Sequence, residues 1–294
     1  MKFIVLLFTI LLQKKIKKQG YRRRRNWFSK MAIPIKSMMG GGASEDSSAD
    51  IYSHKGVGYE VLAFLLLVLL PGLVVGLTID NLQGLSGTLV ALLLSVALLL
   101  YILGRDDFSQ KFDEYKECWL KEDYQGAFEC ADGFLDMEDQ VMPSPCELHH
   151  TVSKAVVYAW FLRFFVFVFW YLALGIGGAL ASLLCYWFYR EFKFEWAKNV
   201  IGAIEWPPSR LLALTSALAG KFTSSFPVAL KSLIDFQTPP NEVLFQVIFP
   251  NMIEEQEFDC SVAGDVLQET NQVMFRSAVI WLVLVALLTT FTGF

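Results

Sequence analysis

Residues 164–189 read FFVFVFWYLALGIGGALASLLCYWFY, a run of 26 residues without a charged side chain. A helix of about 20 apolar residues is long enough to cross the hydrocarbon core of a bilayer. Three further uncharged runs come close to or pass this length: Val61–Ile79, Asn81–Gly104 and Ser277–Phe294. The sequence therefore predicts an all-α protein, a polytopic membrane helical bundle with acidic cytoplasmic helical segments.

The composition points the same way. Hydrophobic residues make up 54% of the chain and charged residues 18%, against about 25% charged in an average soluble domain. This composition argues against a wholly disordered chain and against a nucleic-acid-binding protein. The five cysteines are scattered without a CxxC pair, which predicts free thiols facing a reducing cytoplasm and no zinc site.

Charge is distributed unevenly along the chain. Residues 1–40 contain 11 lysines and arginines and no acid, whereas the other 254 residues contain 14 bases and 29 acids. Basic residues beside membrane spans lie on the cytoplasmic side, where they also contact anionic lipids. Only Lys2 precedes the short apolar run Phe3–Leu12, so we expect this run to be retained as an interfacial or partial helix.

These signals divide the chain into seven regions. We expect a short apolar segment with a basic cytoplasmic region (1–36), a flexible linker (37–57), a transmembrane hairpin (58–104), a cytoplasmic helical segment (105–155), an aromatic, glycine-broken membrane hairpin with an interfacial helix (156–240), a cytoplasmic acidic helix (241–276) and a C-terminal transmembrane helix (277–294).

Two regions require a choice between structures. Basic residues flank residues 156–189 on both sides, which favours a hairpin broken between Leu174 and Ala179 over a single crossing. In residues 105–155, aromatic side chains recur every three or four positions, as on an amphipathic helix. We expect two short antiparallel helices here, with the aromatic side chains forming their core.

A few polar residues could bind a ligand. Arg210 follows Pro207 and Pro208 at the expected start of an apolar helix, and a guanidinium suits a carboxylate or phosphate. Arg105 and Asp106 lie where the second span leaves the membrane, a place for a phosphate or magnesium contact. His150 belongs to a Glu-x-His-His cluster that has too few ligands for a metal site.

Three strings resemble one protein family: MKFIVLL (1–7), WFLRFFVFVFWYLALGIGGALA (160–181) and EWPPSRLLALTSALAGKF (205–222). They resemble the AmpE family of inner-membrane proteins, which is linked to regulation of chromosomal β-lactamase and is distantly similar to the CobD/CbiB membrane enzymes of cobalamin synthesis. The shared tryptophan–proline–arginine–leucine element corresponds to Trp206, Pro208, Arg210 and Leu211. The resemblance implies that Trp206 and Arg210 would line any ligand pocket.

Three functions follow as hypotheses. The resemblance implies first a non-catalytic regulator in the bacterial inner membrane, which senses a cell-wall-derived or nucleotide ligand and has a protein partner in the β-lactamase regulatory and peptidoglycan-recycling pathway. The second hypothesis is a CobD-like ATP-dependent amide-forming ligase, for which MgATP would be the cofactor. The third is a small transporter, suggested by the glycine-interrupted hairpin.

Overall fold

The computed structural model describes residues 2–16, 26–39, 57–82, 84–103, 107–135, 144–250 and 263–292, and all regular structure in these ranges is helical. The helices are α1 (Lys2–Ile16), α2 (Asn26–Met39), α3 (Val57–Phe64), α4 (Leu70–Asp80), α5 (Gly84–Ile102), α6 (Asp107–Leu120), α7 (Tyr124–Leu135), α8 (Pro145–Trp160), α9 (Val166–Phe192), α10 (Glu195–Ala219), α11 (Phe222–Ser232), α12 (Pro240–Ile248) and α14 (Ala263–Thr292). Two π-helical turns, η3 (Leu65–Leu69) and η4 (Phe161–Phe165), join α3 to α4 and α8 to α9.

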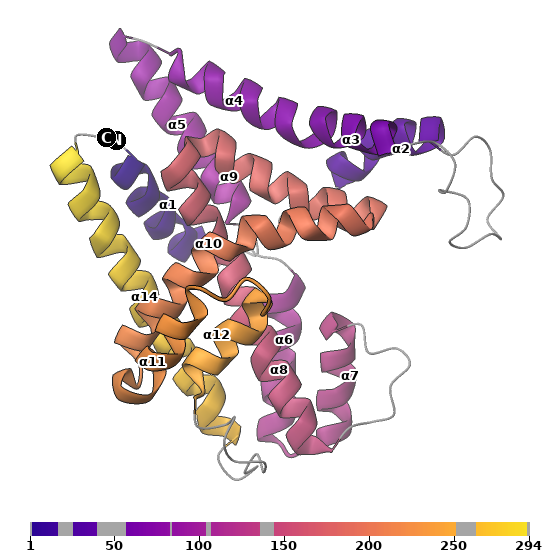
Figure 1. Cartoon of the computed structure of the whole chain (residues 1–294), viewed down its shortest axis with the longest axis vertical. Helices are drawn as coiled ribbons and strands as arrows, with labels where there is room; N and C mark the ends of the chain where they lie inside the picture. The colour runs from indigo at the N-terminus through magenta and orange to yellow at the C-terminus, as the bar shows by residue number, and fades with distance from the viewer. Residues whose placement is uncertain are drawn as a thin grey trace.

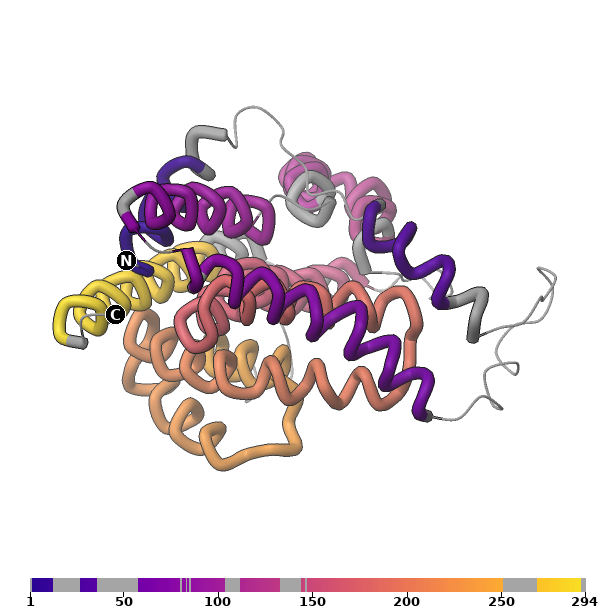
Figure 2. The backbone as a smooth tube through the Cα atoms, turned by 90° about the horizontal axis from the view of Figure 1, so that it is seen from above, coloured from indigo at the N-terminus to yellow at the C-terminus, as the bar shows by residue number. Residues whose placement is uncertain are grey.

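The helices form two layers, one above the other in Figure 1. The upper layer contains α1, α3, α4, α5, α9 and the first half of α10. The lower layer contains α6, α7, α8, α11 and α12, and α14 runs along one side of both layers. Seen from above, α4, the second half of α9 and the first half of α10 run side by side (Figure 2).

Three helical stretches in the described parts of the chain are long and apolar enough to cross a membrane: Gly58–Ile79, Glu147–Phe192 and Glu269–Phe291. Their outward side chains include many large apolar groups, such as Leu73 at 63% exposure. These features favour a membrane protein. The predicted span Asn81–Gly104 corresponds to α5, and Asn81 and Leu82 lie before this helix.

The long stretch from α8 through α9 folds back on itself at Gly175. This residue has φ 72° and ψ −163°, a region of backbone space that is essentially restricted to glycine. The rings of Phe167 and Tyr186 lie 6.3 Å apart, although 19 residues of straight helix would separate them by about 28 Å. The break thus falls inside the predicted interval Leu174–Ala179, and the chain forms a hairpin here.

Three glycines let α4 approach the second half of α9 closely. A methyl group added at Gly177 would lie 2.5 Å from the carbonyl oxygen of Gly72 and 3.1 Å from the Cα of Gly76. The two backbones are therefore in direct contact. Small residues are the usual means by which membrane helices pack this tightly, because lipid provides no hydrophobic force between them.

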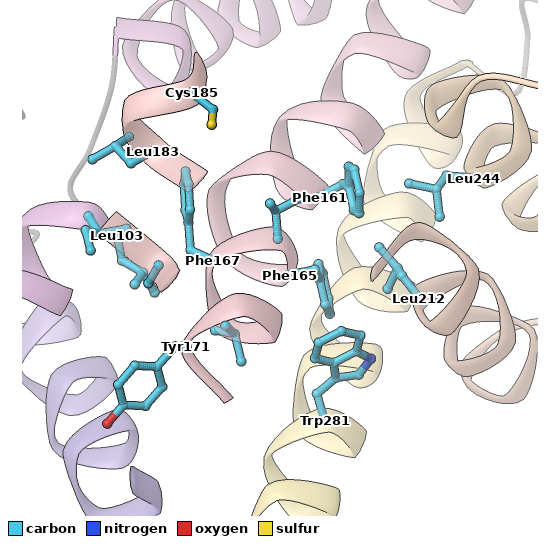
Figure 3. Packing of buried hydrophobic residues seen from close by; sticks show 14 of the residues in the cluster. Leu103, Phe161, Phe165, Phe167, Tyr171, Leu183, Cys185, Leu212, Leu244 and Trp281 are labelled. Carbon is cyan, nitrogen blue, oxygen red and sulfur yellow. The ribbon is translucent and has the colours of Figure 1, made fainter. Parts of the chain in front are cut away.

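The helices pack together through two clusters of buried apolar side chains. In the larger cluster, Phe161 and Phe165 of η4 meet Leu212 of α10, Leu244 of α12 and Trp281 of α14 (Figure 3). The smaller cluster joins α6, α7 and α8, and it includes the aromatic side chains expected to form a core there. Its buried members are Phe112, Tyr115, Ala127, Ala131, Leu148, Val152 and Val156.

Two boundaries differ from the sequence expectation. The predicted acidic helix 241–276 is divided between α12 and the first part of α14, and residues 251–262 lie outside the described residues. α14 continues without a break through the predicted start of the last span at residue 277, and Asn271 before that point accepts a hydrogen bond from Trp160 of α8. The expected linker 37–57 overlaps the end of α2, and residues 40–56 are not among those described.

We expect Gly177→Ala to destabilise the protein in detergent. The added methyl group must push α4 away from α9, and overpacking of this kind costs roughly 1–3 kcal/mol. Thermal unfolding measures the loss. Gly202→Ala in α10 is the matched control, because a methyl group there meets no atom within 4 Å and alanine favours a helix by about 1 kcal/mol. Equal melting temperatures for the two variants would contradict the close helix contact.

Candidate functional site

Arg210 lies in the middle of α10, with only 2% of its surface exposed. Its Nη2 donates hydrogen bonds to the carbonyl oxygens of Asp235 (2.6 Å) and Thr238 (3.2 Å), and its Nη1 donates to Oγ of Ser209 (3.1 Å). The guanidinium therefore binds backbone carbonyls of residues 233–239, the connection between α11 and α12. We call this connection the 233–239 loop.

The 233–239 loop is shaped by Asp235. Its carboxylate accepts hydrogen bonds from the backbone N–H groups of Gln237 and Thr238 and from the hydroxyl of Thr238. These bonds, with those from Thr238 the strongest, lower the pKa of Asp235 to about 2. The ionised side chain thus folds the loop so that its carbonyl oxygens face Arg210.

Trp206 holds the same loop one helical turn before Arg210. Its ring stacks on Phe236 with a centroid distance of 4.7 Å and an interplanar angle of 7°, and its Nε1 donates to the carbonyl of Asp235 at 3.4 Å. The guanidinium carbon of Arg210 lies 5.8 Å from the Trp206 ring. The two predicted ligand residues are thus brought together, but the loop uses most of their binding groups.

Three of the five N–H donors of Arg210 are used in this arrangement. Nε of Arg210 is buried and has no hydrogen-bond partner. A ligand reaching Arg210 would not find the fork of two parallel donors that carboxylate or phosphate recognition uses, because such a fork includes Nη2 and both N–H groups of Nη2 are bound to loop carbonyls. Residues 206–210 and the 233–239 loop are better described as a structural lock than as an open ligand site.

α10 does not begin where the sequence predicts. We expected Pro207 and Pro208 to end the preceding segment and an apolar helix to start at Arg210. In the structure, α10 runs from Glu195 to Ala219 through both prolines. Pro208 has no N–H to give to the carbonyl of Ile204, four residues earlier. The indole Nε1 of Trp170 donates to that carbonyl at 3.1 Å instead. A side chain from α9 thus compensates for the missing bond.

Glu205 is a second polar centre on α10. It is 3% exposed, and one of its carboxylate oxygens accepts hydrogen bonds from Tyr158 (2.7 Å) and Tyr186 (2.8 Å). The two phenols come from α8 and from the second half of α9, so one carboxylate joins three helices. Burial raises the pKa of Glu205, and the two phenol bonds counteract part of this rise.

Sequence reasoning missed this centre. Glu205 was visible as the acid preceding Trp206, but Tyr158 and Tyr186 are 28 positions apart in apolar segments. A straight helix would place them about 42 Å apart. Their meeting at Glu205 depends on the reversal at Gly175, for which the glycine-rich break was the only available signal.

The other candidate residues lie away from Arg210 or outside the described residues. Arg105 and Asp106 belong to residues 104–106, which are not described. His150 is half-buried on α8, with its ring 4.9 Å from that of Phe245 in α12. No group of three or more His, Cys, Asp or Glu side chains able to hold a metal occurs within the described ranges. Cys118, Cys130 and Cys185 are free thiols.

Comparisons of the chain with protein-family models, with curated proteins and with solved structures found no match.

We expect Arg210→Lys to lower the thermal stability of the protein. An ammonium group cannot reproduce the planar guanidinium that bonds Ser209 and two loop carbonyls, and a buried hydrogen bond left unmade costs about 1–3 kcal/mol. Arg190→Lys, at an exposed position of α9, is the control and should leave the melting temperature unchanged. An unaltered melting temperature for Arg210→Lys would contradict the lock.

Glu205 should make stability depend on pH. Because its folded-state pKa is raised above 4.5, the folded protein binds the proton more tightly than the unfolded chain. Its contribution is complete below pH 4.5 and is lost as pH rises through the raised pKa. Glu205→Gln, which keeps an oxygen acceptor for both phenols, should flatten the fall in melting temperature with rising pH.

The exposed Glu117→Gln is the control for this measurement. It should retain the pH dependence of the parent protein. If Glu205→Gln and the parent gave the same pH profile, Glu205 would not be the titrating group.

Proposed function

We propose that the chain is a non-catalytic regulator in the bacterial inner membrane, of the AmpE type. In this proposal, a cell-wall-derived or nucleotide ligand changes the packing of the lower helical layer, and a partner in the β-lactamase regulatory pathway detects the change. The proposal is supported by three helices long enough to cross a membrane and by the family resemblance of three sequence strings, including the element around Trp206 and Arg210.

One observation carries the proposal: a single uninterrupted helical stretch connects the two apolar clusters. From Pro145 to Leu174 the chain runs through α8, η4 and the first part of α9, a length of about 45 Å. Leu148 and Val152 at one end are buried against α6 and α7, and Phe165 farther along is buried in the larger cluster. In this proposal the stretch transmits a displacement at one cluster to the other.

Side-chain contacts attach this stretch to its neighbours near the junction of the two clusters. Trp160 donates a hydrogen bond from Nε1 to Asn271 of α14 at 2.9 Å. Lys154 forms an ion pair with Glu242 of α12 at 3.5 Å. A regulator needs such a connection between a ligand-responsive layer and the membrane helices, whereas an enzyme needs a converging set of reactive groups.

The test is induction of β-lactamase by a β-lactam in a bacterial host that lacks its own AmpE-type protein. We expect production of the chain to change the induced enzyme level. Trp160→Phe should abolish this change, because it removes the bond to Asn271 while the protein still reaches the membrane fraction. Trp196→Phe, which removes a bond to Glu60 of α3 at a distance from the junction, is the matched control and should behave like the parent.

A reporter enzyme fused after residue 130 accompanies this test. It should be active in the cytoplasm, since α6 and α7 would face that side. A periplasmic signal from this fusion, or induction unaffected by the chain, would overturn the proposal.

A further inference from the structure

α11 has small side chains buried and large apolar side chains exposed, the reverse of a helix on the surface of a water-soluble protein. Its fully buried residues are the small Ser225, Ala229 and Ser232, and Phe226 and Val228 pack partly against the larger cluster. Its outward side carries a row of large apolar side chains four residues apart, which continues one step beyond the end of the helix. These are Phe222 (50% exposed), the half-buried Phe226, Leu230 (45%) and Ile234 (82%).

The 233–239 loop extends this apolar row. Phe236 is 72% exposed even though one face of its ring stacks on Trp206. Arg210 and Trp206 fix the backbone between Ile234 and Phe236, so the two side chains are held outward by the lock and are not loosely placed. We call Phe222, Phe226, Leu230, Ile234 and Phe236 the α11 apolar face.

The position of α10 beside α14 indicates what covers this face. α10 runs antiparallel to α14: Thr215 accepts a hydrogen bond from Trp281 at 3.0 Å, and Ser216 lies 3.3 Å from Ser277. At the end of α10, Gly220 lies beside Val273. Lys221, the residue before α11, forms an ion pair with Glu269 of α14 at 3.2 Å. The second half of α10 therefore lies at the depth of the candidate span Glu269–Phe291, and α11 lies near its end.

Exposed apolar residues also occur on α10, which precedes α11, and on α14, which packs on α10. Leu211 and Leu218, seven residues apart on α10, are 44% and 55% exposed, and Phe275 and Val279 on α14 are 65% and 43% exposed. Exposed apolar side chains therefore occur on α10 and α14 as well as on the α11 apolar face. Lys231 is exposed next to Leu230, where its long side chain can reach lipid phosphates.

We infer that the α11 apolar face is inserted into the bilayer, with its side chains against phospholipid acyl chains near the headgroup boundary. α11 then makes an interfacial lipid contact outside the three candidate spans. This inference rests on the membrane location in the proposed function. It gives Trp206 and Arg210 a definite role, which is to present Ile234 and Phe236 to lipid.

The test uses the photoreactive residue p-benzoylphenylalanine, introduced into the full-length chain at Ile234, irradiated in native membranes and analysed by mass spectrometry. We expect a phospholipid adduct at Ile234. The same substitution at Val283 of α14, an exposed position of a candidate span, is the positive control. Leu120 of α6, which is 79% exposed in the lower layer, is the negative control and should give no lipid adduct.

The outcomes separate this inference from the membrane location itself. Lipid adducts at both Val283 and Ile234 support it. A lipid adduct at Val283 with a crosslink to protein at Ile234, either a second copy or another chain, leaves the membrane location intact and overturns the inference. A lipid adduct at Val283 and unmodified p-benzoylphenylalanine at Ile234 overturns it as well. No lipid adduct at either position would count against the membrane location.

Discussion

The arrangement of the upper layer depends on a single backbone conformation, that of Gly175. A side chain at φ 72°, ψ −163° is strained, so this position allows only glycine to turn α9 back on itself. The reversal brings Tyr158 and Tyr186 to the same oxygen of Glu205. It also lays Gly177 against Gly72 and Gly76, so that α4, α9 and α10 run side by side.

Properties that follow from local composition could be predicted from the sequence. Long uncharged runs predicted an all-helical chain, and the glycines after Leu174 predicted a break that the structure places at Gly175. The aromatic spacing in α6 predicted a core formed by its ring side chains, and Phe112 and Tyr115 are buried there. In each case the determining residues lie within a few positions of one another.

Properties that depend on distant partners could not be predicted. The guanidinium of Arg210 suited a carboxylate or phosphate, but two of its three acceptors are backbone carbonyls 25 and 28 residues away, which no side-chain pattern reveals. Pro207 and Pro208 signalled a helix boundary, but the indole of Trp170 satisfies the free carbonyl of Ile204. In both cases a hydrogen bond between residues far apart in the sequence, and not the local sequence pattern, determined the structure.

The π-helical turn η4 has a consequence for how the chain tolerates changes in length. Buried side chains follow one another every four residues at Leu148, Val152 and Val156, then five residues later at Phe161, and again four later at Phe165. The turn thus accommodates one residue more than a regular α-helix. Losing one residue there would convert the turn to α-helix and leave both clusters in register. The same loss within α8 would rotate one cluster by about 100° relative to the other.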